Sequence, residues 1–226
     1  MQNSKCFSGP QPTESIFASP LFSPPRIKRF TALFDCPGEL AVRSFDLTAL
    51  HNKGEHQSEE LAEFYLNPAE RQKFKSFNLA KRKVAWLAGR ICAKNAVQAV
   101  WQRDFRTRAD WHNLRISSDS AGRPFLETAR PMRLTIPDIS ITHSGNQAAA
   151  LASLHHLCGL DLQKINSTVI RVKSHFASPA ELDLLLANRT FMSEKAALTM
   201  LWSGKEAVRK AFPCRPLPGF MDLRLQ

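Results

Sequence analysis

Residues 201–211, with the sequence LWSGKEAVRKA, predict a helix that carries several reactive side chains. An α-helix brings positions i, i+4 and i+8 to one face, so Trp202, Glu206 and Lys210 should lie side by side. A carboxylate beside an ammonium group suits magnesium and phosphate chemistry, and it equally suits an ordinary ion pair on a protein surface. The rest of the chain has to decide between these two interpretations.

The overall composition is that of a globular protein with a basic surface. The 226 residues carry a net charge of +11, and 43% of them are hydrophobic, which is enough for a core. This length suits one large domain or two small ones. No apolar run reaches the roughly 18 residues of a membrane span. The five cysteines are scattered without a CxxC pair, which argues against a disulfide framework or a zinc site and favours the reducing cytoplasm.

The excess of positive charge predicts a polyanionic partner. Nucleic acid, an anionic membrane, a phosphorylated ligand or an acidic protein would each satisfy it. The sequence lacks zinc-finger and RNP signatures and the aromatic-basic repeat of single-strand-binding proteins. Nucleic-acid binding therefore rests on net charge alone, and we expect neither a nucleic acid nor a membrane as partner.

The first third of the chain predicts a leader followed by helices. Residues 1–29 mix proline with serine and small residues and are expected to be disordered. Residues 51–60 are polar and predict a loop. At residues 67–70, NPAE, an asparagine cap, a proline and a glutamate three residues after the cap predict a helix start.

A second helix is expected over residues 81–101. Lys83, Arg90 and Lys94 fall along another face of this helix, and Lys83 and Lys94 are interpreted as solvated surface charges. The positions that recur with helical period and should face inward are Val84, Leu87, Ala88, Ile91 and Asn95.

The second half of the chain predicts short strands and two further helices. Strands are expected at 114–117, 139–142, 148–154, 158–163 and 219–225. In the segment 158–163, Asp161 and Gln163 point to one face, as ligands for a hard cation or as an ordinary polar strand face. The sequence SPAE at 178–181 repeats the helix-start pattern of residues 67–70, and the last helix should open at 193 or 194.

Four motifs occur in one order along the chain. They are KRK at 81–83 through GR at 89–90, SITHSG at 140–145, GLDLQ at 159–163 and WSGKEAVRKA at 202–211. Together they resemble the 4'-phosphopantetheinyl transferases of the surfactin-synthetase-activating type, over about residues 64–225. The resemblance implies an α+β fold in two layers, built as a pseudo-twofold pair of similar α/β halves with coenzyme A between them.

The same resemblance implies a division of the chain. A disordered leader would span residues 1–29, the N-terminal half residues 30–157, and the C-terminal half residues 158–226. Relatives usually continue past the strand that matches 219–225, so the C-terminal half is expected to be incomplete, with an exposed sheet edge.

Members of this family transfer the 4'-phosphopantetheine arm of coenzyme A to a serine hydroxyl of an acyl or peptidyl carrier protein, with Mg²⁺, and release 3',5'-ADP. By position, Asp161 and Glu206 match magnesium ligands, with Gln163 as a third. Glu206 also matches the general base, and Lys210 would offset negative charge on the pyrophosphate. The residues that match contacts to coenzyme A are Lys73, Arg123, Thr142, His143 and Lys210. Arg90 is a weaker match, with a purely structural role as the alternative. The basic surface would steer coenzyme A and acidic carrier proteins.

One departure concerns the metal site. Gln163 stands where bacterial members commonly have glutamate, so weaker magnesium binding is expected. This departure and the short C-terminus leave open a second interpretation, a non-catalytic relative that binds coenzyme A or a carrier protein. A duplicated fold within one chain predicts a monomer, and the cysteine pattern predicts a cytoplasmic protein.

Overall fold

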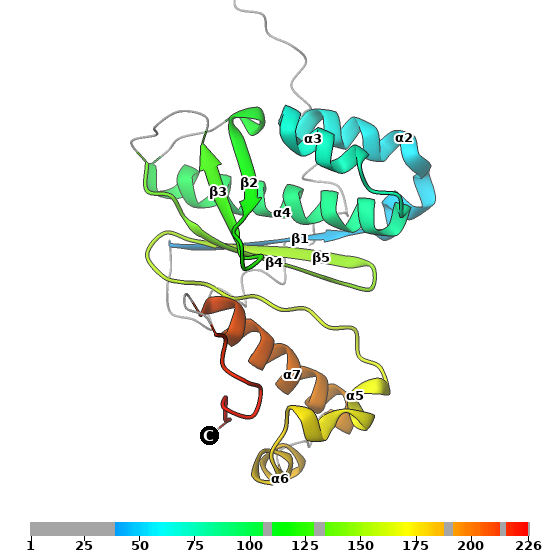
Figure 1. Ribbon diagram of the computed structural model, residues 1–226, viewed down its shortest axis with the longest axis vertical. Coiled ribbons are helices and arrows are strands. Elements are labelled where there is room, and N and C mark those ends of the chain that lie inside the picture. Colours follow the sequence, from blue (N-terminus) through cyan, green and yellow to red (C-terminus); the bar gives the residue numbers. More distant parts are fainter. Residues whose placement is uncertain (1–38, 106–109, 129–133, 188–191, 213–215, 226) are drawn as a thin grey trace, which may run out of the picture.

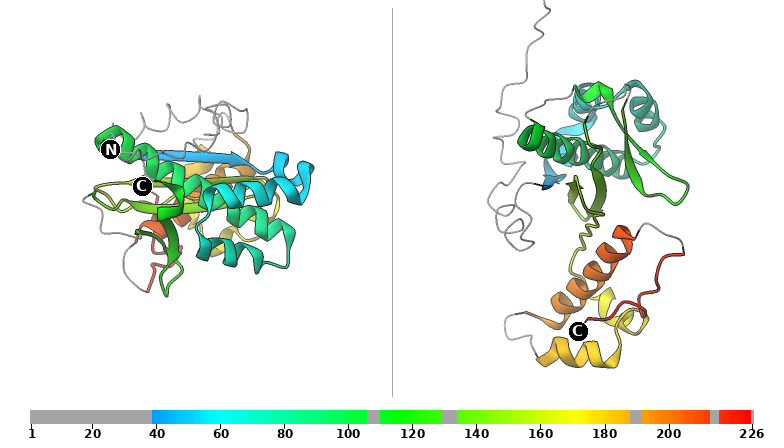
Figure 2. Two further views of the ribbon diagram at one scale, coloured as in Figure 1. Left: turned by 90° about the horizontal axis from the view of Figure 1, so that it is seen from above. Right: turned by 90° about the vertical axis from the view of Figure 1, so that its left-hand side faces the viewer.

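The computed structural model describes residues 39–105, 110–128, 134–187, 192–212 and 216–225. The predicted leader, residues 1–29, lies outside the described residues. Figure 1 shows an upper block, in which helices cover a sheet, and a lower block of helices, with an extended segment running from one to the other. The right-hand view of Figure 2 shows the same two blocks from the side. The mixture of helices and strands agrees with the predicted α+β class.

The elements follow each other in chain order. The upper block contains β1 (Leu40–Asp46), α2 (Thr48–Tyr65), α3 (Pro68–Lys75), α4 (Ala80–Phe105), β2 (Leu114–Ser118), β3 (Pro124–Thr128), β4 (Asp138–Ser144) and β5 (Gln147–Ser153). The lower block contains α5 (Thr168–Arg171), α6 (Pro179–Ala187) and α7 (Glu194–Ala211). Short 3-10 turns lie at Trp111–Asn113 and Lys173–His175.

The main sheet has the strand order β1-β5-β4, with antiparallel neighbours. Its central strand, β5, is rich in alanine, so helix α4 can pack closely on it. The turn between β4 and β5 contains Gly145 with φ 58°, a left-handed conformation that glycine adopts without strain. Strands β2 and β3 form a separate antiparallel hairpin.

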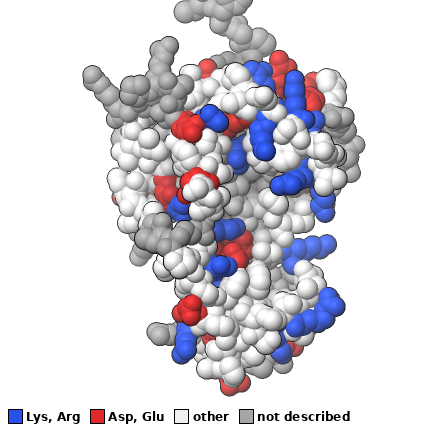
Figure 3. Space-filling model, in the orientation of Figure 1, with Lys and Arg blue, Asp and Glu red and all other residues white. Residues whose placement is uncertain are grey.

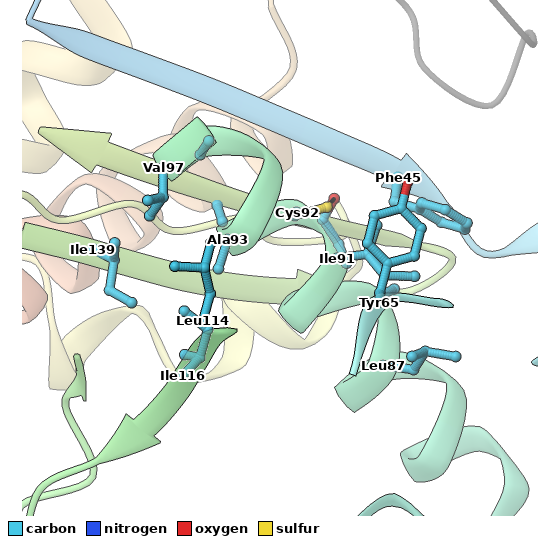
Figure 4. Packing of buried hydrophobic residues seen from close by; sticks show 14 of the residues in the cluster. Phe45, Tyr65, Leu87, Ile91, Cys92, Ala93, Val97, Leu114, Ile116 and Ile139 are labelled. Carbon is cyan, nitrogen blue, oxygen red and sulfur yellow. Dashed lines mark hydrogen bonds between the residues drawn. The ribbon is translucent and has the colours of Figure 1, made fainter. Parts of the chain in front are cut away.

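Helix α4 forms the centre of the upper core. Its predicted inward positions are confirmed: Leu87, Ala88 and Ile91 are fully buried, and Val84 and Asn95 are nearly so. Figure 4 shows α4 side chains such as Ile91 and Val97 among residues of β1, β2 and β4. A Cβ at Gly89 would lie 2.9 Å from the Ile141 side chain, so a glycine here permits the close approach of α4 to β4.

Two expectations for the upper block are wrong. Residues 51–60, predicted as a loop, belong to α2, whose buried Leu50, Ala62 and Tyr65 join the core. These ten residues are polar, whereas the apolar residues that α2 buries lie before residue 51 and after residue 60. The helical pattern is therefore visible only over the whole helix. Lys94, predicted as a surface charge, is fully buried and paired with Glu70.

The lower block has its own hydrophobic cluster. Phe176, Leu185, Leu198 and Leu201 bring α6, α7 and the loop before α6 together. Trp202 is partly buried and packs against this cluster. Two predicted strands do not form here: residues 158–163 are extended without strand pairing, and residues 219–225 contain a turn. In the described parts of the chain, every helix is too short or too polar to cross a membrane.

Candidate active site

Residues 158–164, called here the edge segment, run alongside β4. The hydroxyls of Ser140, Thr142 and Ser144 project from one face of β4, because alternate residues of a strand share a face. They accept hydrogen bonds from the backbone N–H groups of residues 160, 162 and 164, at 3.0, 3.1 and 2.9 Å. In a β-strand these N–H groups would donate to the backbone carbonyls of a neighbouring strand. Here they donate to side-chain hydroxyls, which explains why the predicted strand is absent.

Helix α7 packs against the other side of the edge segment. A Cβ at Gly159 would lie 1.8 Å from the Ala207 carbonyl oxygen, so only glycine permits this contact. The edge segment therefore lies between β4 of the upper block and α7 of the lower block, and it fixes Asp161 at their junction.

Asp161 is the centre of a hydrogen-bonded group at this junction. Its side chain is only 4% exposed. Oδ1 accepts from Lys210 Nζ at 2.6 Å and from Thr142 Oγ1 at 3.2 Å, and Oδ2 accepts from Gln163 Nε2 at 2.9 Å. Lys210 also donates to the Leu160 carbonyl at 3.2 Å. The structure thus gathers four of the predicted site residues from β4, the edge segment and α7.

Arg123 forms a second link between the blocks. From the β2–β3 turn its guanidinium donates to the Lys210 carbonyl and, at 2.5 Å, to Asp138 Oδ2. Asp138 Oδ2 also accepts from the Cys158 N–H at 2.6 Å. The end of α7 is therefore tied to the hairpin turn, and the start of the edge segment to β4.

A pocket of about 400 Å³ lies beside this link. Residues 119–124 of the β2–β3 turn, residues 139–141 of β4 and the end of α7 line it. Its lining contains Arg123, Arg209 and Lys210, so its walls carry more positive than negative charge. Such a pocket suits an anionic ligand.

Glu206 lies one turn before Lys210 on α7. Its carboxylate accepts from Arg209 Nη1 at 3.0 Å, and both side chains are 24% exposed. No cluster of three or more His, Cys, Asp or Glu side chains with metal-binding spacing occurs among the described residues. The oxygen atoms of Asp161, Gln163 and Glu206 are nevertheless the donor type that Mg²⁺ prefers.

Two predicted contact residues lie outside both the Asp161 group and the Arg123 link. His143 is exposed at the end of β4, next to Thr142. Lys73 is exposed on α3, where its ammonium group lies 5.5 Å from the Phe77 ring centroid. Arg90, on α4, places its guanidinium 4.6 Å from the Trp86 ring centroid. Burial lowers the Arg90 pKa, and the Glu70 carboxylate opposes this effect.

Sequence reasoning missed a buried ion pair in each block. In the upper block Lys94 Nζ donates to Glu70 Oε2 at 2.6 Å and to the carbonyls of Tyr65 and Trp111 at 2.7 and 2.9 Å. The other oxygen of Glu70 accepts from the Ile116 N–H at 2.9 Å. The Lys94 pKa is lowered, because burial outweighs the attraction of the Glu70 carboxylate.

The lower block repeats this arrangement. Lys205 Nζ donates to Glu181 Oε2 at 2.9 Å and to the carbonyls of Phe176 and Phe220 at 2.6 and 3.0 Å. The Leu225 N–H donates to Glu181 Oε1 at 2.8 Å. In both pairs lysine follows glutamate by 24 residues. The repeated PAE pattern with a lysine at equal distance was the sequence signal for them.

The chain aligns with curated enzymes of one kind. It is 35% identical over 98 residues to the holo-[acyl-carrier-protein] synthase of Lactococcus lactis subsp. lactis strain IL1403, which covers 43% of this chain and 81% of that protein. This chain belongs to the holo-[acyl-carrier-protein] synthase family. The enzyme of the same name from L. lactis subsp. cremoris strain SK11 is 32% identical over 98 residues, with the same coverage of both chains.

The chain was also compared with solved structures and with family models. A crystal structure of the Bacillus anthracis holo-(acyl-carrier-protein) synthase is 22% identical, with a TM-score of 0.41, and covers 52% of this chain and 95% of that one. No family model matches the chain.

Proposed function

We propose that this protein transfers the 4'-phosphopantetheine arm of coenzyme A to a serine hydroxyl of an acyl or peptidyl carrier protein and releases 3',5'-ADP. Membership of the holo-[acyl-carrier-protein] synthase family supports this reaction. The observation that links this reaction to specific residues is the Thr142–Asp161–Lys210 group. This group lies at the junction of the blocks, and its Lys210 also lines the basic pocket.

Glu206 is the proposed general base. It takes the proton of the carrier serine, directly or through a water molecule, so that the serine oxygen can attack the β-phosphorus of coenzyme A and break its bond to 3',5'-ADP. Lys210 Nζ, held between Asp161 and the Leu160 carbonyl, offsets negative charge on the pyrophosphate.

Asp161, Glu206 and Gln163 would hold Mg²⁺. When bound, the ion neutralises charge on the pyrophosphate oxygens. Thr142 keeps the Asp161 carboxylate oriented through its hydroxyl. Because Gln163 Nε2 already donates to Asp161, its carbonyl oxygen is the atom that would face a cation.

Coenzyme A would bind in the basic pocket and along β4. Arg123 lines the pocket, and Thr142 and His143 lie at the end of the same strand that forms one wall. Lys73 is a more remote proposed contact. Figure 3 shows Lys and Arg gathered at the right of this face, over the region of α3 and the start of α4. Such a surface would attract a polyanionic cofactor and an acidic carrier.

We also propose that residues 30–157 and 158–226 are the two related halves of a transferase of the surfactin-synthetase-activating type. The repeated Glu–Lys pair and the repeated cap support the relationship. Both walls of the pocket come from one chain, so a monomer would suffice. The buried free thiols Cys92 and Cys158 are consistent with a cytoplasmic location.

One observation favours a second candidate, a protein that binds coenzyme A without catalysis. Asp161 is buried and already paired with Lys210, so a cation would have to displace or share this contact. Gln163 supplies an amide oxygen where a carboxylate would bind a cation more strongly.

One experiment separates the two candidates. The protein is incubated with an apo-carrier protein, coenzyme A and Mg²⁺, and the carrier is weighed by mass spectrometry. A gain of one phosphopantetheine supports the transferase, and Glu206→Ala should reduce the rate by about 100-fold or more. Glu194→Ala, in the first turn of the same helix, is the matched control and should retain activity. Absence of a mass gain, with coenzyme A binding retained in calorimetry, would support the binding protein.

A further inference from the structure

Residues 216–225, called here the C-terminal strap, cross the lower block beside α7. The strap is anchored by the buried pair: the Phe220 carbonyl accepts from Lys205, and the Leu225 N–H donates to Glu181. The Phe220 ring stacks on Trp202 with centroids 4.6 Å apart. Contacts with the buried pair and with Trp202 therefore anchor a segment that lacks regular secondary structure.

The anchored strap in turn holds Arg209. Arg209 Nε donates to the Pro218 carbonyl at 3.0 Å, and its guanidinium lies 4.5 Å from the Phe220 ring centroid. The same guanidinium donates through Nη1 to Glu206 at 3.0 Å. A continuous set of contacts thus runs from the Glu181–Lys205 pair through the strap and Arg209 to the Glu206 carboxylate.

The upper block contains a similar buried pair that, among the described residues, has no connection through a strap and an arginine to an active-site carboxylate. Its Glu70–Lys94 pair has the same spacing, burial and carbonyl contacts. The residue after Lys94 is Asn95, whose amide donates back to the Ile91 carbonyl within α4. The pair by itself is therefore a means of fixing a helix against its surroundings, and only the lower copy adjoins a carboxylate at the candidate active site.

We propose that the Glu181–Lys205 pair, acting through the C-terminal strap and Arg209, positions Glu206 for proton removal. This inference rests on the proposed function for its kinetic consequences. Lys205 is a positioning residue: its side chain is 5% exposed and points into the block, while the adjacent Glu206 is accessible. Three partners from three segments hold the Lys205 ammonium group, so the rotation of α7 about its axis is fixed. A displacement of the base by about 1 Å can reduce the rate by about 100-fold.

The repeated pair supplies a matched test. The double variant Lys205→Met with Glu181→Gln removes the lower pair without leaving a lone buried charge, and Lys94→Met with Glu70→Gln does the same in the upper block. Both should lower the unfolding temperature to a similar extent. We expect kcat to fall about 100-fold in the lower variant, with the KM for coenzyme A within about twofold, and kcat to stay near wild type in the upper variant. Equal loss of kcat in both variants would mean a general structural role and would overturn the proposal.

Two further measurements keep the proposal testable if the double variant fails to fold or if the protein is inactive. Arg209→Gln breaks the link between strap and Glu206 at a partly exposed site, and it should lower kcat with little change in unfolding temperature. The NMR signal of the Arg209 Nε–H reports the strap contact without any turnover. It should shift or exchange faster in the lower variant and stay unchanged in the upper one; an unmoved signal would refute the positioning path. If the wild-type protein is inactive, the proposed function is rejected. The NMR comparison would still show whether the Glu181–Lys205 pair positions Arg209.

Discussion

Lys210 donates a 2.6 Å hydrogen bond to Asp161, which lies 49 residues earlier in the chain. The carboxylate is almost fully buried, whereas the lysine side chain is 31% exposed. One partner is thus fixed in the junction between the blocks, and the other keeps access to the basic pocket. This asymmetry suits the proposed role of Lys210, in which its ammonium group exchanges a protein contact for a phosphate.

The Asp161–Lys210 contact predicts a strong effect of Asp161→Asn. Asparagine keeps the size of the side chain but removes the charge that would hold Mg²⁺ and Lys210. We expect the transfer rate to fall by about 100-fold or more, measured as holo-carrier formation at saturating Mg²⁺. The exposed Asp183→Asn on α6 is the control and should leave the rate unchanged. An Asp161→Asn enzyme with wild-type rate would exclude Asp161 from the reaction.

Gln163→Glu should strengthen magnesium binding. A carboxylate at this position adds negative charge beside Asp161, so less Mg²⁺ should be needed for half-maximal activity, by several-fold. Without the ion the same change replaces a hydrogen bond by repulsion between two carboxylates, so the metal-free variant should unfold at lower temperature. Titration of Mg²⁺ against activity measures the first effect. Identical half-saturation in both proteins would remove Gln163 from the metal site.

Substitution of glycine by alanine should have opposite effects on stability at Gly159 and at Gly204. Gly159→Ala would place a Cβ 1.8 Å from the Ala207 carbonyl oxygen, so the edge segment and α7 must separate. We expect a loss of several kcal/mol in the free energy of unfolding, together with loss of activity. Gly204 lies in α7, and a Cβ added there would have no atom of the described residues within 4 Å apart from neighbouring atoms of the helix itself, so Gly204→Ala should stabilise the helix by about 1 kcal/mol or less. Denaturant unfolding of both variants tests the pair, and a Gly159→Ala protein as stable as wild type would contradict the contact.

We expect the protein to lose stability in acid, because protonation of Glu181 removes a stabilising interaction. Burial would raise its pKa, but hydrogen bonds from Lys205, Ser178 and Leu225 outweigh burial and lower the pKa to about 2. The folded protein therefore binds this proton more weakly than the unfolded chain, and the stabilisation is present above the ordinary pKa of about 4.5. It should be lost as the pH falls from about 4.5 toward 2, by roughly 3 kcal/mol. Unfolding measured across this range should depend less on pH in Glu181→Gln, and an unchanged pH dependence would contradict the assignment.

Local patterns predicted much of the fold. The capping box at Asn67 and Glu70, the apolar stripe of α4 and the strands around the turn at Gly145 all form where the sequence placed them. The sequence also placed Asp161, Gln163 and Lys210 among the reactive residues, and the structure joins them in one group. Each of these features depends on neighbours within a few residues or on motifs with a fixed spacing.

Other features depended on partners distant in sequence. Lys94 has the same local pattern as a surface lysine, and its burial becomes favourable through partners distant in sequence. These are the Glu70 carboxylate on another helix and the carbonyls of Tyr65 and Trp111. The edge segment has strand-like alternation, yet the hydroxyls of β4 take its N–H groups. The sequence alone determined which residues carry charge and which segments tend to be helical. The tertiary structure decided which charges are buried and which carboxylate meets which cation, because the partners that satisfy a buried group come from distant parts of the chain.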